Sequence, residues 1–287
     1  MIVVDIGNSG LRAASVLSTG LSNSQQASAG MPGLGRVFKL SWSAVGHSIH
    51  KAQPQRIERS GERWSQLGDR EALEWIVDQC DPEHVGVWRI ASVNRSVMDS
   101  LCQCIRSKHP AARIEPIRAA DVGLEIDVLY PDRVGIDRLL AARAALRIVR
   151  RGEAEATPII VVQAGTALTI DWVTERDCFA GGAILPGVGL ALQVLAAGTD
   201  QLPWLPTDSI TDFPALPGKS TDQAIAAGVH ASVVGGARFL IERYRQGRAI
   251  PVVISGGDGK LLRSVIEGPV QVVENLVLLG LALSPNS

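Results

Sequence analysis

The chain has 287 residues, 46% of them hydrophobic and 20% charged, and its 28 basic side chains nearly balance its 29 acidic ones. This composition excludes a chain that is disordered throughout, and a net charge of −1 gives no reason to expect nucleic acid or an anionic membrane as a partner. Residues 1–5 lack the basic region of a secretory signal, and the apolar stretch 273–283 is too short to span a membrane. We therefore expect a cytoplasmic protein.

The first predicted element is a β-hairpin. Residues 2–6 are an apolar run that favours a strand, residues 7–10 (Gly-Asn-Ser-Gly) favour a tight turn, and residues 11–16 favour a second strand. The segment 17–36 is rich in Ser, Gly, Gln and Asn, which predicts a surface loop. Helices are predicted over residues 68–80 and 97–108, on either side of a buried strand over residues 85–93.

A second start follows in the middle of the chain. After Pro131 we predict a helix over residues 133–151, then a break, and then a strand over residues 159–162. The turn at residues 163–166 (Gln-Ala-Gly-Thr) and a strand over residues 168–173 repeat the order of the first hairpin. Two such copies about half a chain apart predict a duplicated α/β architecture with a cleft between its halves.

Further glycine-rich segments lie beyond this second hairpin. Glycines and a proline flank a short strand within residues 181–187, and a helix is predicted over residues 188–197. A strand over residues 250–254 ends at another glycine-rich turn, residues 255–259. The segment 181–187 is open to two interpretations, a compact turn before a helix or part of a site lining.

The three glycine-rich turns that end strands are the strongest indication of chemistry. Glycine lets the backbone approach a ligand closely, and turn N–H groups can converge on phosphate oxygens. A carboxylate at the strand end, Asp5, is placed to face Mg²⁺ carried by that phosphate. An ordinary tight hairpin explains any one of these turns, but three in one chain favour phosphate binding.

The segment Gly135-Ile136-Asp137-Arg138 stands near the start of a predicted helix. In one interpretation Asp137 complements the helix dipole and Arg138 is solvated. In the other, Asp137 is a general base and Arg138 is a planar donor for a substrate carboxylate. The spacing alone favours the first interpretation.

Seven short motifs follow one another along the chain: Asp5-x-Gly7-Asn8-Ser9, Gly135-x-Asp137-Arg138, Gly165-Thr166-Ala167-x-Thr169-x-Asp171, Gly181-Gly182-x-Ile184-x-Pro186-Gly187, Thr199-x-x-Leu202-Pro203, Gly218-Lys219-Ser220-Thr221 and Ser255-Gly256-Gly257. Their order and intervals resemble the type III pantothenate kinases over nearly the whole chain. The resemblance implies a duplicated actin-like/sugar-kinase (ribonuclease H-like) fold with two halves around a nucleotide cleft. It divides the chain into residues 1–120, with the phosphate-binding hairpin, and residues 121–287, with the pantothenate site and a dimer interface.

The resemblance also implies the activity and the site residues. The activity is ATP-dependent phosphorylation of pantothenate to 4′-phosphopantothenate, the first step of coenzyme A biosynthesis, by a homodimer whose pocket includes residues of both subunits. Asp137 would accept the proton of the pantothenate hydroxyl, and Arg138 would face the pantothenate carboxylate. The implied pantothenate contacts are Gly135, Ile136, Asp137, Arg138 and Thr199. The implied contacts to ATP and its Mg²⁺ are Asp5, Ile6, Gly7, Asn8, Ser9, Gly10, Leu11, Arg12 and Thr166, with Asp5 facing the metal.

Three features depart from this family pattern. Gln163 stands where similar kinases usually have the Asp associated with a monovalent cation, K⁺ or NH₄⁺, so the resemblance does not carry that cation site over intact. Val128 stands seven residues before Gly135, where an aromatic substrate contact is common, and Tyr130 lies two positions further on. The segment 17–60 is longer than the family needs.

Two other functions stay open at this point. One is a non-catalytic relative that acts as a regulatory or binding protein, although the near-zero net charge and the absence of basic runs argue against direct DNA contact. The other is a kinase of another small hydroxy acid, which the Val128 departure motivates.

Overall fold

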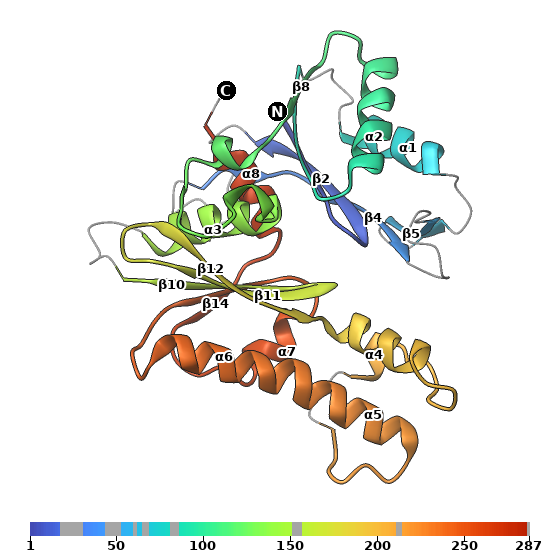
Figure 1. Ribbon diagram of the computed structural model, residues 1–287. Helices are drawn as coiled ribbons and strands as arrows, with labels where there is room; N and C mark the ends of the chain where they lie inside the picture. The colour runs from blue at the N-terminus through green and yellow to red at the C-terminus, as the bar shows by residue number, and fades with distance from the viewer. Residues whose placement is uncertain are drawn as a thin grey trace. The chain divides into compact units, whose positions relative to one another are not determined.

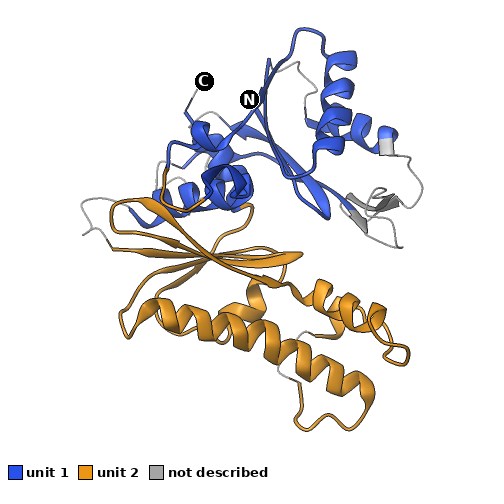
Figure 2. Ribbon diagram, in the orientation of Figure 1, with its two compact units in different colours: residues 1–124, 130–151, 276–287 blue, residues 125–129, 152–275 orange. Residues whose placement is uncertain are grey.

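The computed structural model describes residues 1–17, 31–43, 53–59, 62–64, 69–80, 86–150, 157–210 and 214–285. The chain divides into unit 1, made of residues 1–124, 130–151 and 276–287, and unit 2, made of residues 125–129 and 152–275 (Figure 2). Each unit contains a mixed β-sheet with helices packed on it, as the predicted duplicated α/β architecture requires.

The sheet of unit 1 runs in the order β6-β5-β4-β2-β1-β7-β8, and β3 pairs with β2 (Figure 1). Its strands are β1 (Ile2–Ile6), β2 (Gly10–Leu17), β3 (Gly33–Leu34), β4 (Phe38–Ser43), β5 (Gln53–Arg59), β6 (Glu62–Trp64), β7 (Val87–Ser92) and β8 (Arg113–Pro116). Its helices are α1 (Asp69–Cys80), α2 (Arg95–Lys108), α3 (Ile136–Val149) and α8 (Leu276–Leu283), with 3₁₀ turns at Ala119–Val122 and Pro131–Arg133. Strand β1 is antiparallel to β2 and parallel to β7.

Helices cover both faces of this sheet. One face packs on α1 and α2 through a core that includes Ile2, Val4, Ile6, Trp88 and Ile90. Because successive side chains of a strand point to opposite faces, the residues between these point to the other face, where α8 packs on β1, β2 and β7. This second face therefore carries Val3 and Asp5 from β1, and Arg89 and Ala91 from β7.

The sheet of unit 2 runs in the order β14-β13-β10-β11-β12-β9 (Figure 1). Its strands are β9 (Glu125–Ile126), β10 (Ile159–Ala164), β11 (Ala167–Val173), β12 (Cys178–Pro186), β13 (Val252–Ser255) and β14 (Val270–Val272). Its helices are α4 (Val188–Ala197), α5 (Thr221–His230), α6 (Gly236–Arg245) and α7 (Gly259–Arg263), with a 3₁₀ turn at Thr207–Ser209 and a π-helical turn at Ala231–Gly235. Apolar side chains of all four helices share one core with β10, β11 and β13.

Helices α5 and α6 and the π-helical turn between them form one continuous helix, Thr221–Arg245, of 25 residues. By length and composition it is apolar enough to cross a membrane, so the expectation that no stretch reaches that length is wrong for this segment. A core helix passes the same test, and Ile225, Val229, Val233 and Ile241 pack in the core of unit 2. The apolar character of the helix is thus explained by burial within its own unit.

Several predicted elements have other bounds in the structure. Helix α3 begins at Ile136 rather than residue 133, because Pro131–Arg133 form a separate 3₁₀ turn and Gly135 caps the helix. Strand β12 has nine residues and runs through both glycines of the segment 181–187, so the prediction of a short strand flanked by glycines is wrong. Gly182 is needed there because a Cβ would lie 2.8 Å from the Cα of Asp171 on β11.

The segment 17–60 also differs from the predicted loop. Strands β3, β4 and β5 lie within it, and β4 and β5 extend the sheet of unit 1. Residues 18–30 and 44–52 of this segment lie outside the described residues. Strand β2 pairs with β1 along one edge and with β4 along the other, so the added strands continue the sheet that the β1–β2 hairpin begins.

The predicted division between residues 120 and 121 places two helices in another half than the structure does. It assigns α3 and α8 to the second half, whereas both belong to unit 1. The reason is packing: α8 lies against α3 and against β1, β2 and β7 of the first sheet. The chain therefore leaves unit 1 after α3 and returns to it with α8.

Candidate active site

The first glycine-rich turn joins β1 to β2. The N–H of Gly7 donates a hydrogen bond to the carbonyl oxygen of Gly10 at 2.8 Å, which closes the turn. A Cβ at Gly10 would lie 2.5 Å from the carbonyl oxygen of Leu40 on β4, so the neighbouring strand requires glycine there. Asn8 and Ser9 are exposed at the tip. The turn therefore presents backbone and small polar groups to solvent.

The other predicted ATP contacts lie on the two strands. Ile6 and Leu11 are fully buried in the core, so their side chains anchor the hairpin and do not meet a ligand. Arg12 faces Asp5 across the strands, since these two residues are paired in the register of β1 and β2. The hairpin thus holds a guanidinium and a carboxylate side by side near the turn.

Asp5 is the titratable group at the centre of this arrangement. Burial raises the pKa of its carboxyl from 3.8 to about 7, the charge of Arg12 opposes this rise, and the charge of Asp137 adds to it. Asp5 and Asp137 both belong to unit 1, and their charges interact. They come from β1 and from α3.

Asp137 occupies the second position of α3 and folds back over the helix N-terminus. Its carboxylate accepts hydrogen bonds from its own backbone N–H and from that of Arg138. Burial raises the pKa of Asp137, whereas these hydrogen bonds and the charge of Arg138 oppose the rise. A Cβ at Gly135 would overlap the Oδ1 atom of Asp137, which explains the Gly-x-Asp spacing. Asp137 therefore complements the helix N-terminus and also lies near Asp5, so its two interpretations are compatible.

Gly135, Ile136 and Arg138 are all partly buried in the same turn as Asp137. Thr199, by contrast, belongs to unit 2, just beyond α4, where its hydroxyl donates a hydrogen bond to the carbonyl oxygen of Leu195 at 2.8 Å. The structure thus groups four of the five predicted pantothenate contacts. A contact between Thr199 and pantothenate stays a prediction.

Glycine-rich segments also meet within unit 2. The N–H of Gly187 donates to the carbonyl oxygen of Thr166 at 2.9 Å, and a Cβ at Gly187 would overlap the carbonyl oxygen of Gly165. Gly256 has φ +106°, and a Cβ there would lie 2.5 Å from the carbonyl carbon of Ala164. The turn after β10, the start of α4 and the end of β13 therefore converge. Thr166 is exposed at this convergence.

The sequence analysis missed Asp258 at the same place. Its backbone N–H donates to the carbonyl oxygen of Ala164 at 3.2 Å, and its carboxylate accepts a hydrogen bond from the N–H of Val188 at the start of α4. Burial raises the pKa of Asp258, and this hydrogen bond opposes the rise. The signal available in the sequence was an acidic residue directly after Gly256-Gly257 at a strand end.

Gln163 lies on β10 between Thr169 of β11 and Ser255 of β13. Its amide nitrogen Nε2 is buried and has no hydrogen-bond partner among the described residues. A buried N–H donor lacks an acceptor here, whereas a monovalent cation requires oxygen ligands and compensating negative charge. The side chain at this position does not fit a cation site.

Val128 and Tyr130 fall in different units. Val128 lies beside β12, with its Cγ1 atom 3.5 Å from where a Cβ would stand on Gly181. Tyr130 belongs to unit 1 and is 58% exposed, and its ring is covered on one side by the guanidinium of Arg133, whose Cζ lies 4.7 Å from the ring centroid. Tyr130 thus belongs to the same unit as Gly135, which it precedes by five positions in the sequence.

The sequence profile of the family described as type III pantothenate kinase matches residues 1–243. The chain belongs to the type III pantothenate kinase family. A type III pantothenate kinase from Rhodopirellula baltica is 35% identical over 283 residues, which cover 98% of this chain and 96% of the relative. One from Chromobacterium violaceum is 36% identical over 209 residues, covering 70% of this chain and 81% of the relative.

Solved structures show the fold of the family. A Campylobacter jejuni protein described as a Baf-family transcriptional activator has a TM-score of 0.52 and 20% identity, covering 98% of this chain and 96% of its own. Acetate kinase from Entamoeba histolytica has a TM-score of 0.50 and 9% identity, covering 98% of both chains. At such identities only the fold is comparable. The predicted duplicated actin-like/sugar-kinase fold is confirmed.

Proposed function

We propose that the chain transfers the γ-phosphoryl group of ATP to the hydroxyl group of pantothenate, which gives 4′-phosphopantothenate and ADP in the first step of coenzyme A biosynthesis. Membership of the type III pantothenate kinase family supports the substrates. The structural observation that carries the proposal is the placement of two buried carboxyl groups in unit 1, Asp5 beside the glycine-rich turn and Asp137 in the first turn of α3, whose charges interact.

In this proposal Asp5 and the β1–β2 turn hold the phosphates of ATP with their Mg²⁺. The metal neutralises charge that develops on the phosphoryl group. Asp5 fits it because a carboxylate is a hard oxygen ligand, and its raised pKa shows that the protein alone compensates its charge incompletely. Loss of its proton when the metal binds would restore the ionised form.

Asp137 is the group that we place at the attacking hydroxyl. The oxygen–phosphorus bond to pantothenate forms, the bond from Pγ to the bridging oxygen breaks, and the hydroxyl proton passes to the Asp137 carboxylate while ADP leaves. Burial raises its pKa, which makes the carboxylate a stronger base, and the hydrogen bonds at the helix N-terminus and the charge of Arg138 oppose this rise. Since phosphoryl transfer passes through a loose transition state, orientation of the hydroxyl matters as much as proton removal.

The remaining parts of the proposal concern assembly and ions. We place pantothenate's carboxylate at Arg138 and the working protein in the cytoplasm as a homodimer. Membership of the family supports the homodimer, and unit 2 exposes large apolar side chains that are available for association, among them Trp204 and Phe239. The orphaned amide of Gln163 supports weak dependence on K⁺ or NH₄⁺. Light scattering after size exclusion tests the dimer, and a monomer at assay concentration would exclude it.

Val128 supports a second candidate function, phosphorylation of another small hydroxy acid. An aliphatic side chain beside Gly181 stands where the family pattern leads one to expect an aromatic substrate contact, and the loss of such a contact favours a different substrate. The site chemistry would be unchanged, because Asp5, Asp137 and Arg138 act on any hydroxy acid alike.

One experiment tests both candidates. The purified chain is incubated with Mg²⁺–ATP and either pantothenate or a panel of small hydroxy acids, and ADP release and product mass are followed. We expect pantothenate to give the highest kcat/KM and a product of the mass of 4′-phosphopantothenate. Preferred turnover of another acid would favour the second candidate, and absence of turnover with every acid would refute the kinase proposal.

A further inference from the structure

Helices α8 and α3 cross in direct backbone contact. A Cβ at Gly280 of α8 would overlap the carbonyl oxygen of Leu140 on α3, and would lie 2.6 Å from its carbonyl carbon and 2.9 Å from its Cα. Residues 276–281 are all buried, so this crossing is part of the core of unit 1. Leu140 lies three residues after Asp137, less than one turn along the same helix. The crossing therefore supports the turn that carries Asp137.

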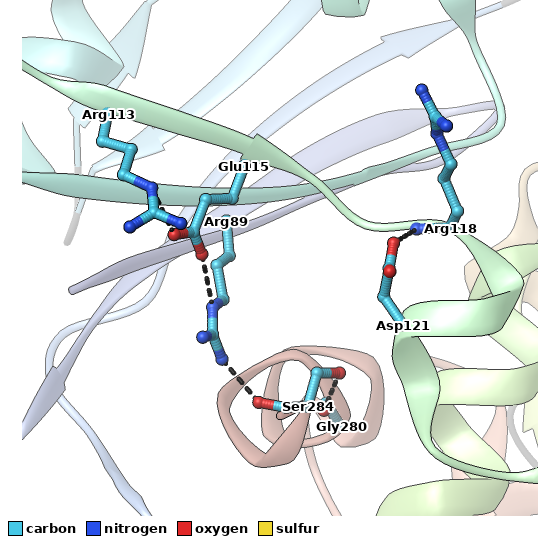
Figure 3. A network of polar contacts seen from close by, with 7 residues as sticks. All are labelled: Arg89, Arg113, Glu115, Arg118, Asp121, Gly280 and Ser284. Carbon is cyan, nitrogen blue, oxygen red and sulfur yellow. Dashed lines mark hydrogen bonds and ion pairs between the residues drawn. The ribbon is translucent and has the colours of Figure 1, made fainter. Parts of the chain in front are cut away.

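The other end of α8 is tied to the sheet (Figure 3). Arg89 of β7 donates from its terminal nitrogen to the carbonyl oxygen of Ser284 at 2.6 Å and from Nε to Oε2 of Glu115 on β8 at 3.0 Å. Glu115 also accepts from Nε of Arg113 at 2.9 Å. The side chains of Arg89 and Glu115 are only 3% and 9% exposed. Removal of one partner of a buried pair leaves an uncompensated charge, so Glu115 fixes Arg89 in place, and Arg89 in turn ties the end of α8 to β7 through its hydrogen bond to Ser284.

The same arginine is linked to the strand that carries Asp5. Arg89 pairs in register with Val3 of β1, and Ala91, two residues further, pairs with Asp5. Both Arg89 and Asp5 point to the sheet face on which α8 packs. A continuous path of contacts therefore runs from β1 through Arg89 to the end of α8, and from Gly280 through Leu140 to the start of α3.

We propose that α8 is a positioning element for the reaction, in which Gly280 and Arg89 set where Asp137 lies relative to Asp5. This inference rests on the proposed role of Asp137 as the base. Gly280 sets the depth at which α3 lies on α8, and Arg89 fixes α8 on the sheet that holds Asp5. Neither residue is catalytic, since both act through α3.

The size of the effect follows from the packing distances. Carbon atoms in contact normally lie about 3.5–4.0 Å apart, so a methyl group on Gly280, 2.6 Å from the carbonyl carbon of Leu140, requires a shift of about 1 Å. A misplacement of about 1 Å at a catalytic group costs on the order of 10²-fold in rate. The added methyl group meets α3 and not the strands β1 and β2 on which α8 also packs, so binding of ATP is expected to change much less than turnover.

The test is the variant Gly280→Ala in the full chain, compared at equal folded concentration. We expect kcat to fall about 10- to 100-fold while KM for ATP changes by less than about threefold. One control is Gly228→Ala of α5, where no described atom lies within 4 Å of the added Cβ. The other is Leu101→Ala of α2, which opens a cavity on the opposite face of the sheet and lowers stability without touching α3.

A second pair of variants keeps the test decisive if Gly280→Ala does not fold. Arg89→Lys retains a positive charge that can bond either Glu115 or the carbonyl oxygen of Ser284, but not both. Arg89→Met retains a long side chain with neither the charge nor a hydrogen-bond donor. We expect kcat to fall in Arg89→Met and to recover in part in Arg89→Lys, again with KM for ATP unchanged. If the activity lost in Arg89→Met is fully accounted for by its smaller folded fraction, as expected for Leu101→Ala, the proposal is overturned.

The double variant Asp137→Asn with Gly280→Ala separates this inference from the proposed function. If Gly280 acts through Asp137, its substitution has little further effect once the carboxylate is gone. Near-normal activity of Asp137→Asn would refute the assignment of the base itself. A strongly impaired Asp137→Asn together with a fully active Gly280→Ala would refute only the positioning role of α8.

Discussion

Replacing Asp5 by asparagine has opposite expected effects on stability and on catalysis. The pKa of Asp5 is raised in the folded chain, to about 7 from 3.8, so the folded state keeps a proton that the unfolded chain releases. Such a group contributes stability at low pH, and the contribution is lost as the pH rises from about 4 through about 7. A shift of roughly three pH units at about 1.4 kcal/mol each gives a cost of up to about 4 kcal/mol above pH 7. Partial exposure of Asp5 makes this an upper limit.

The assay compares urea unfolding of the native chain and of Asp5→Asn between pH 4 and pH 8.5, without nucleotide. We expect equal midpoints near pH 4 and a more stable variant at pH 8, because asparagine carries no charge to desolvate. Turnover at pH 8 should show the reverse, with the apparent KM for Mg²⁺–ATP raised about tenfold or more by loss of the metal-facing carboxylate. A stability difference that does not change with pH, or a variant less stable at pH 8, would refute the reasoning.

Three further variants test the site. Asp137→Asn keeps the size of the side chain but removes the base, so we expect kcat to fall about 10²-fold or more; near-normal turnover in a coupled ADP assay would show that the base is elsewhere. Gly135→Ala places a methyl group on Oδ1 of Asp137, so kcat should fall about tenfold or more with KM for ATP unchanged, whereas equal kcat values would show that the carboxylate tolerates displacement. For Gln163 we expect turnover of the native chain to depend little on K⁺ in sodium-balanced buffer, and saturable activation that is the same in Gln163→Asp would contradict this.

The elements that could be predicted from the sequence are those whose ends are marked by a glycine next to them in the chain. The β1–β2 hairpin followed from an apolar run ending at a glycine-rich turn, and α4 lies over the predicted residues 188–197 because Gly187 precedes it and Gly198 follows it. Strand β12 was not predicted at full length because its glycines suggested a turn. In the structure Gly182 allows the close approach of β11, which is a contact between strands. Propensity within the segment carries no information about that neighbour.

The candidate site divides in the same way. The Gly-x-Asp-Arg turn was predictable because Asp137 makes its hydrogen bonds, and its contact with Gly135, within four residues of sequence. Asp258 was not, because its partners are Ala164 and Val188, which lie far away along the chain. The arginine of the α8 network left one trace, a charged Arg89 in the middle of an otherwise apolar strand, but its partners Glu115 and Ser284 are set by the fold.

The crossing of α8 and α3 also bears on the order in which the chain can fold as it is synthesised. Leu140 and Gly280 are 140 positions apart, so α3 leaves the ribosome long before its partner helix exists. Residues 152–275 of unit 2 are translated in the interval, and they can fold first together with the earlier segment 125–129. The unit that contains residue 1 is then the later one to be completed. A nascent chain stalled before residue 276 would carry Asp5 and Asp137 with α3 held against the sheet only by its smaller contact with β7, without the α8 crossing.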